Sequence, residues 1–134
     1  MAPVDTISGF THANILVTDL ASAHDFYINK LGFSVFPRPD FGGFAGAWYR
    51  IGPLQLHLVV VEEMPDWKGG MPHLALHVPT DRFDATIDEL KSNGVTFLGD
   101  TMSREDFGVP VKAAFCTDPA GNTIELTDVA PLSD

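Results

Sequence analysis

Three histidines and one glutamate have the residue types and the spacing to do chemistry in this 134-residue chain. His12 lies in "THANILV", His57 in "LQLHLVV", His73 in "HLALHV" and Glu125 in "NTIELTD". Imidazole nitrogens and carboxylate oxygens are ligands that zinc, nickel, iron, cobalt and manganese accept, in sets of four to six donors. The four side chains therefore predict a divalent metal site, provided that the fold brings them together.

Alternation along the strands indicates that these side chains share a face. Side chains of a strand point to opposite sides in turn, so the leucines at 54, 56 and 58 leave Gln55 and His57 on the other face. The same alternation separates His73 from Leu74 and Glu125 from Leu126. Gln55 and His57 lie about 7 Å apart along the strand, so we expect one of them to be the ligand, with His57 the chemically better donor.

Two further groups are open alternatives for acid or base chemistry. Tyr49 and His77 are candidates for proton transfer, although Tyr49 also fits ordinary core packing. His77 lies four residues after His73, about 13 Å along the strand, and is expected in a pocket wall or the core instead of at the same ion. Glu125, with His57, is the candidate for moving a proton during the reaction. His24 is expected on the surface of a helix.

An internal repeat supplies the elements that must position these residues. A strand, a helix and three strands are expected over about 8–64, and the same order returns over about 70–130. The first helix begins near Asp19, capped by Asp19 or by a Ser22–Asp25 capping box. The second follows Thr80, with a strand predicted at 95–100 after it. The chain is thus predicted to be one α+β domain, 1–134, in which two βαβββ modules with pseudo-twofold symmetry form an open, cup-shaped mixed sheet.

Composition excludes several classes of partner. The formal charge is −10 and the pI near 4.6, so the surface repels nucleic acid and anionic membranes. The apolar run at 56–61 is far shorter than the roughly 20 residues that a spanning helix needs. The single cysteine, Cys116, forms no internal disulfide, and the N-terminus has no secretion signal. A cytoplasmic protein that acts on a small molecule is the expectation.

Two stretches give the pattern a family resemblance. "HANILVTDLASAHDFYINKLGF" and "DPAGNTIEL" resemble signatures of the vicinal oxygen chelate superfamily, which includes glyoxalase I, extradiol dioxygenases, fosfomycin-resistance enzymes and bleomycin-resistance proteins. The resemblance runs from Thr11 to Asp128 and implies two βαβββ modules around a divalent ion. It assigns metal ligands to His12, His73 and Glu125, with His57 at a position that varies between members. It also implies a homodimer whose sites are built by one chain or shared by two.

The resemblance leaves the reaction open among three alternatives. The first is a lyase or isomerase of glyoxalase type, in which the ion chelates vicinal oxygens and stabilises an enediolate. Bacterial glyoxalase I usually has two histidines and two glutamates, whereas His57 here replaces one glutamate. The second is a single-module extradiol dioxygenase with a two-histidine, one-carboxylate iron site. The third is a metal-free binding protein of bleomycin-resistance type. Candidate pocket residues are Phe36, Phe41, Phe44, Trp48, Phe107 and Phe115, with Arg38, Arg50 or Arg104 for an anion.

Overall fold

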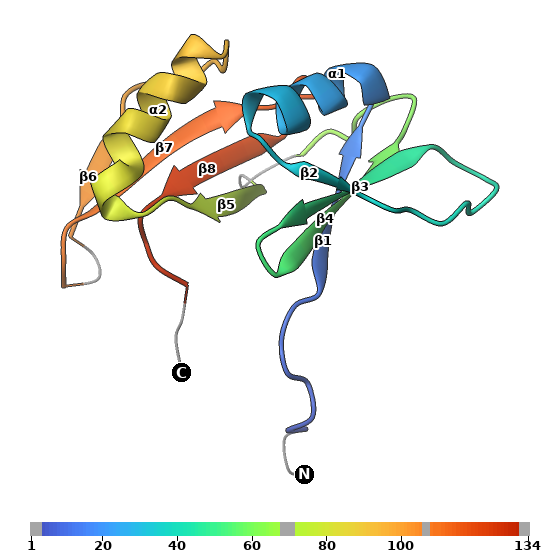
Figure 1. Cartoon of the computed structure of the whole chain (residues 1–134), viewed down its shortest axis with the longest axis horizontal. Coiled ribbons are helices and arrows are strands. Elements are labelled where there is room, and N and C mark those ends of the chain that lie inside the picture. The colour runs from blue at the N-terminus through green and yellow to red at the C-terminus, as the bar shows by residue number, and fades with distance from the viewer. Residues whose placement is uncertain (1–3, 68–71, 106–107, 132–134) are drawn as a thin grey trace.

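The computed structural model describes residues 4–67, 72–105 and 108–131 as two four-stranded sheets lying side by side, each with its own helical segment (Figure 1). The first half contains β1 (His12–Val17), α1 (Leu20–His24), η1 (Asp25–Lys30), β2 (Ser34–Phe36), β3 (Gly46–Ile51) and β4 (Leu54–Val60). The second half contains β5 (His73–His77), η2 (Thr80–Arg82), α2 (Phe83–Ser92), β6 (Met102–Arg104), β7 (Val111–Thr117) and β8 (Thr123–Thr127). The predicted α+β repeat is confirmed.

Strand order is the same in the two sheets. The first runs β1-β4-β3-β2 and the second β5-β8-β7-β6. In each, the first and last strands of the half are parallel neighbours, and the remaining pairs are antiparallel. The parallel pair needs a long crossover connection, which the helix and the two intervening strands provide. The first and last strands of each half, which carry the four predicted ligands, therefore lie side by side.

The helical segments begin and end where local chemistry dictates. Asp19 caps α1, since its carboxylate accepts a hydrogen bond from the Ala21 N–H at 3.2 Å, which resolves the two alternatives for the cap. The helix continues from α1 into η1 as a π-helix and ends before Gly32, whose φ of +85° suits glycine. Gly94, with φ +92°, has the same place after α2.

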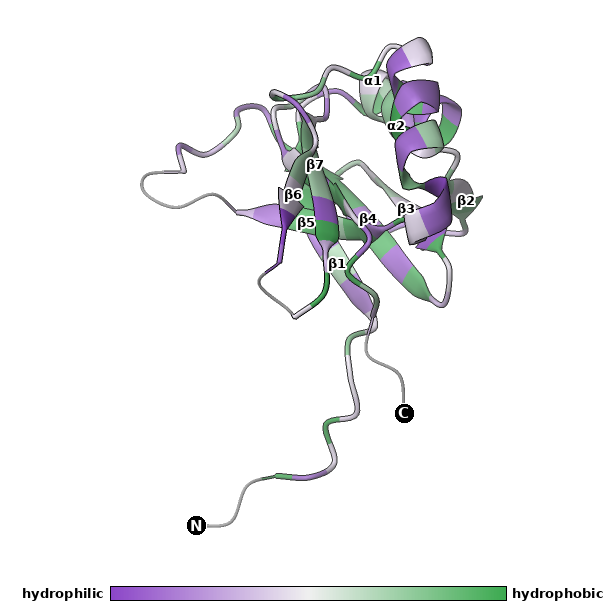
Figure 2. Ribbon diagram, turned by 90° about the vertical axis from the view of Figure 1, so that its left-hand side faces the viewer, coloured by the Kyte–Doolittle hydropathy of each residue, from purple (hydrophilic) through white to green (hydrophobic). Residues whose placement is uncertain are grey.

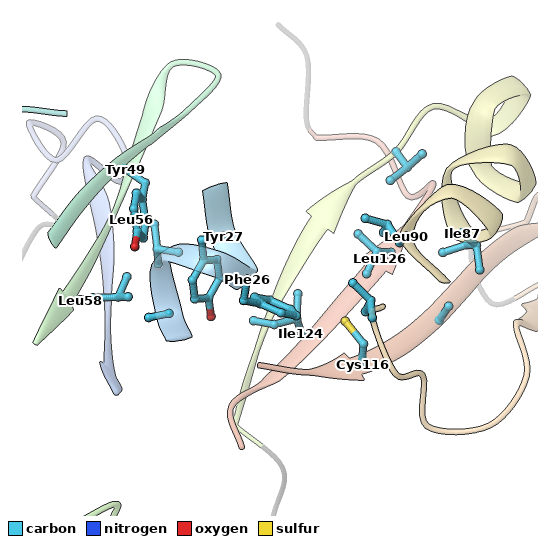
Figure 3. Close-up of a cluster of buried hydrophobic side chains, with 14 of the residues drawn as sticks. Phe26, Tyr27, Tyr49, Leu56, Leu58, Ile87, Leu90, Cys116, Ile124 and Leu126 are labelled. Carbon is cyan, nitrogen blue, oxygen red and sulfur yellow. The ribbon is translucent and has the colours of Figure 1, made fainter. Parts of the chain in front are cut away.

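The core is continuous across the two halves. Figure 3 shows Tyr27 of η1 between the side chains of the first sheet and Ile124 of the second. Tyr49, Leu56 and Leu58 come from the first sheet and are at most 1% exposed. The second half adds buried side chains from α2 and from the sheet beneath it, which are Phe83, Ile87 and Leu90 of α2, Cys116 of β7, and Ile124 and Leu126 of β8. In the hydropathy colours of Figure 2, the strands carry green and purple in alternation, as the sequence pattern predicted.

One strand prediction is wrong. Residues 95–100 form no strand, and only Phe97 makes an isolated bridge, to Cys116. Val95 is buried and Gly99 has φ +79°, so the segment turns away after a short contact. The strand at this edge is β6, which begins at Met102, two residues after the end of the predicted strand.

The two halves are joined by one buried carboxylate. Asp118, 4% exposed, accepts a hydrogen bond from the Tyr27 hydroxyl at 2.7 Å. It also accepts hydrogen bonds from the backbone N–H groups of Ala120 and Asn122 and from the Asn122 side chain. The Asn122 amide in turn donates to the Leu16 carbonyl at 2.7 Å. The "DPAGN" turn of the second half thereby bonds both η1 and β1 of the first.

Candidate metal centre

The first half of the candidate site is a stack of three aromatic rings. The register pairs Asn14 of β1 with His57 of β4, and His57 with Trp48 of β3. The His57 ring lies 4.1 Å from the His12 ring and 4.1 Å from the Trp48 ring, within 16° and 6° of parallel. Stacking holds His57 in place, and its residue is only 8% exposed.

The imidazole of His57 is held in its neutral form. Burial, with the nearby charges of His12 and Arg38, lowers the pKa of His57. Its Nε2 lies 2.8 Å from the side-chain oxygen of Gln55, and an amide oxygen can only accept a hydrogen bond. Nε2 therefore carries the proton and Nδ1 the lone pair. Gln55 and His57, the two alternatives for a ligand on β4, contact each other.

His12 has the arrangement typical of an orienting hydrogen bond. Its Nδ1 lies 2.8 Å from the Thr11 hydroxyl. A histidine that binds a metal through one ring nitrogen usually has a hydrogen-bond partner at the other, which fixes the ring. When Nδ1 donates to this hydroxyl, Nε2 holds the lone pair. The sequence reasoning did not identify Thr11, although a hydroxyl next to a candidate ligand is a usable signal.

The second half of the candidate site is a histidine next to a carboxylate. His73 Nε2 lies 3.2 Å from a carboxylate oxygen of Glu125, and the Phe115 ring meets the His73 ring edge-on at 5.8 Å. The register pairs Ala75 of β5 with Glu125 of β8. Glu125 thus has the register position in the second sheet that His57 has in the first, and His73 corresponds to His12.

The four predicted ligands form two pairs within one chain. Over the described ranges, no three His, Cys, Asp or Glu side chains gather closely enough to hold an ion. His12 lines a largely apolar cavity of ≈ 790 Å³, Glu125 one of ≈ 400 Å³ and His73 one of ≈ 370 Å³. Each half therefore supplies two of the four predicted donors.

Other predicted residues lie elsewhere. Tyr49 is 0% exposed on the face of β3 opposite Trp48, and its hydroxyl lies 2.7 Å from His24 Nδ1, so it is a core residue and not an acid or base in the cup. His24, predicted on the surface, is half-buried by this contact. His77 is exposed at the end of β5 and lines two of the cavities. Phe107 lies outside the described residues.

The donor set fits a borderline divalent cation. His12 is oriented by its hydrogen bond to Thr11, and His57 by its stacked ring. The carboxylate among the four donors, that of Glu125, is half-buried. Three neutral imidazoles and one carboxylate would leave such an ion with a net charge of about +1, which favours an anionic ligand with two oxygens. In the parts of the chain described here, no helix is long and apolar enough to cross a membrane.

Comparison with known proteins agrees with this architecture of paired βαβββ halves. Residues 9–126 match the model of the Glyoxalase/Bleomycin resistance protein/Dioxygenase superfamily, and the chain belongs to this superfamily. The glyoxalase family protein from Enterococcus faecalis has a similar structure, with a TM-score of 0.76 and 22% identity over 90% of this chain and 98% of that one.

Two further solved structures share the fold. The glyoxalase/bleomycin resistance protein/dioxygenase from Alicyclobacillus acidocaldarius gives a TM-score of 0.71 at 22% identity, covering 92% of this chain and 93% of that one. The fosfomycin resistance protein from Mesorhizobium loti gives 0.71 at 15% identity, covering 93% and 94%. At such low identity these structures establish the fold, while the reaction must be argued from the residues of this chain.

Proposed function

We propose that this protein is a metal-dependent enzyme that chelates two vicinal oxygens of a small substrate and moves a proton, as a lyase or isomerase of glyoxalase type. The observation that carries the proposal is the register equivalence of the His12–His57 and His73–Glu125 pairs. A divalent zinc, nickel, iron, cobalt or manganese ion would be held by these four side chains. When bound, it supplies a Lewis acid that makes the C–H bond beside a chelated carbonyl more acidic.

Side chains of this protein would supply the proton acceptor, the neutral metal ligand and the walls of the site. The carboxylate of Glu125, half-buried and close to His73, is the group to accept the substrate proton and return it. His57, neutral and fixed between two rings, donates a lone pair without adding charge. The largely apolar cavity that His12 lines offers a surface for the carbon skeleton of the substrate.

We also propose that the site is completed by a second copy of the chain. One chain supplies two donors on each sheet and, within the described residues, never three together. A twofold dimer places the same surfaces of two copies against each other, so the first half of one copy can face the second half of its partner. Two equivalent four-donor sites result from one such dimer. A cytoplasmic location stays a prediction.

The first experiment is elemental analysis of the untagged protein, before and after chelation and reloading with individual divalent metals. About one ion per chain, with methylglyoxal-type hemithioacetals converted and no dioxygen consumed, is the expected result. His73→Ala and Glu125→Ala should each remove the ion. An unchanged metal content in both variants, or no metal under any loading condition, would contradict the proposal and leave a metal-free binding protein.

Mixing two inactive variants tests the shared site. His12→Ala and Glu125→Ala damage different halves, so a mixed dimer with shared sites has one site with both changes and one intact site. After exchange of subunits, about a quarter of all sites should recover. Sites within single chains would recover none. His12→Ala mixed with His57→Ala is the matched control, because both changes affect the same half and no pairing restores a site.

The Gln55–His57 hydrogen bond favours one second candidate. If Gln55 keeps His57 bonded, His12, His73 and Glu125 remain as a two-histidine, one-carboxylate set, which suits iron(II) and dioxygen. Ring cleavage of catechols is then the reaction. Dioxygen consumption by the iron-loaded protein on addition of catechol, unchanged in His57→Ala, would favour this candidate over proton transfer.

A further inference from the structure

Arg38 is held in one place by two phenylalanines and two prolines. Its guanidinium carbon lies 5.0 Å from the Phe41 ring centre and 5.2 Å from that of Phe44, and the two rings are parallel within 4°. Its Nη2 donates to the Phe44 carbonyl at 3.3 Å. Arg38 stands between Pro37 and Pro39, and a residue before proline is restricted to extended backbone. The side chain is therefore positioned before any ligand arrives.

A glycine makes room for this guanidinium beside the stacked rings. A Cβ at Gly46 would lie 3.1 Å from Arg38 Nε and 3.2 Å from Nη2, and would overlap the Leu58 carbonyl oxygen. Gly46 comes two residues before Trp48 on β3 and so shares its face of the strand. Trp48 is the ring that stacks on His57. Arg38 thus lies one step along the sheet from the candidate metal ligand.

The charge of Arg38 is available to a ligand. Over the described ranges, no carboxylate lies within ion-pairing distance of its guanidinium, although the chain carries 18 acidic side chains against 8 basic ones. A cation with no carboxylate beside it creates a local positive potential on an otherwise acidic protein. Anions are therefore attracted to Arg38. The planar guanidinium presents paired N–H donors that match the two oxygens of a carboxylate.

The surfaces around Arg38 are flat and apolar. Phe41 and Phe44 are 51% and 50% exposed, and the Phe41 ring lies 6.1 Å from the Trp48 ring at 47°. Phe36 stacks on Trp48 at 6.2 Å. Exposed aromatic faces of this kind bind flat apolar groups by offset or edge contacts. A ligand that reaches from Arg38 towards His57 passes along them.

We propose that Arg38 binds the carboxylate of the substrate, and that the substrate is a small acid whose vicinal oxygens are carried on a flat, aromatic or conjugated skeleton. The carboxylate bonds to Arg38, the skeleton lies along Phe41 and Trp48, and the oxygens extend towards His12 and His57. This inference rests on the proposed function, since it names the substrate class of the same site. Arg38 determines specificity and takes no part in proton transfer.

Binding to the metal-free protein tests the inference separately from metal chemistry. Trp67→Phe leaves Trp48 as the remaining tryptophan, so its emission reports on ligands near the stacked rings. The probes are benzoate and its neutral analogue benzamide. We expect benzoate to bind at least about ten-fold more tightly, and Arg38→Gln in this background to remove that advantage while benzamide binding stays within about two-fold.

Matched variants and a competitor make the result decisive. Arg82→Gln removes the same charge from exposed η2 and should leave benzoate binding unchanged, whereas Arg38→Lys should give an intermediate loss because the paired donors are gone. Circular dichroism confirms that each variant is folded. Equal binding of benzoate and benzamide, equal losses in Arg38→Gln and Arg82→Gln, or inorganic phosphate binding as tightly as benzoate would each overturn the inference. Failure to load metal would leave these titrations interpretable.

Discussion

The two halves of this protein have the same strand order and register but different side-chain chemistry. In the first, the rings of His12, His57 and Trp48 form a stack close to Arg38. In the second, His73 lies against the carboxylate of Glu125, with one ring, Phe115, edge-on. The two halves thus share their backbone geometry but differ in the charge of the side chains at equivalent positions. On the proposed function, the first half would provide flat surfaces and a cation for the substrate, and the second would provide the negative charge for the metal and the acceptor for the proton.

Removing Asp118, whose carboxylate connects the two halves, should have the largest effect on stability. Asp118→Ala removes the acceptor of four hydrogen bonds and leaves the Tyr27 hydroxyl and two backbone N–H groups buried without it. We expect a loss of about 3 to 4 kcal/mol in the free energy of unfolding, measured by urea denaturation. Asp128→Ala, which removes the side-chain acceptor for the Lys112 N–H, is the control and should cost about 1 to 2 kcal/mol. Equal losses would show that the halves are stabilised independently of this joint.

Removing the charge of the second half should nearly abolish metal binding. Glu125→Gln keeps the shape of the side chain but replaces a charged donor by a weak neutral one. We expect metal affinity to fall by about 100-fold or more, measured by competition with a chromophoric chelator. Gln55→Glu is a useful companion, since it adds a carboxylate beside His57 without touching the second half. A Glu125→Gln protein that binds metal as tightly as the parent would remove the distinction between the halves.

Making the halves alike should weaken anion binding. His57→Glu gives the first half the carboxylate that the second already has, so a bound divalent ion would have no net positive charge left. We expect benzoate to bind the metal-loaded variant about ten-fold more weakly than the parent, by calorimetric titration. His57→Gln, neutral like the native imidazole, should change the affinity less. An unchanged affinity in His57→Glu would show that the charge of the ion does not reach the ligand.

Replacing Tyr49, on the core face of β3, should give the smallest effect of these variants. Burial raises the pKa of Tyr49 to about 12, from an ordinary value of 10.0. The folded state therefore keeps the proton that the unfolded chain loses, so this contribution to stability is full below pH 10 and is lost as the pH rises from 10 towards 12. Tyr49→Phe should reduce the alkaline loss of stability, by about 1 kcal/mol at pH 11, while leaving catalysis unchanged. A loss of activity at neutral pH would return Tyr49 to the site.

Local sequence patterns predicted much of the fold. Alternation along "LQLHLVV" and "NTIELTD" placed His57 and Glu125 opposite the core leucines, and the repeat placed both on the last strand of a half. That each last strand pairs with the first strand of its half came from the structure. Phe83, Ile87 and Leu90 recur at helical spacing in the sequence, and all three are buried in α2. The strand at 95–100 failed because two glycines with positive φ leave too short a segment to pair.

What only the tertiary structure decided is where the two pairs of donors lie relative to each other. Successive side chains of a strand point to opposite sides, so the sequence alone predicts on which face of the strand each side chain lies. The placement of one sheet against the other depends on contacts far apart in the chain, such as Tyr27 with Asp118 and Asn122 with Leu16. No spacing rule contains those contacts. Within the described residues, these contacts hold the halves so that the His12–His57 pair and the His73–Glu125 pair do not form one cluster.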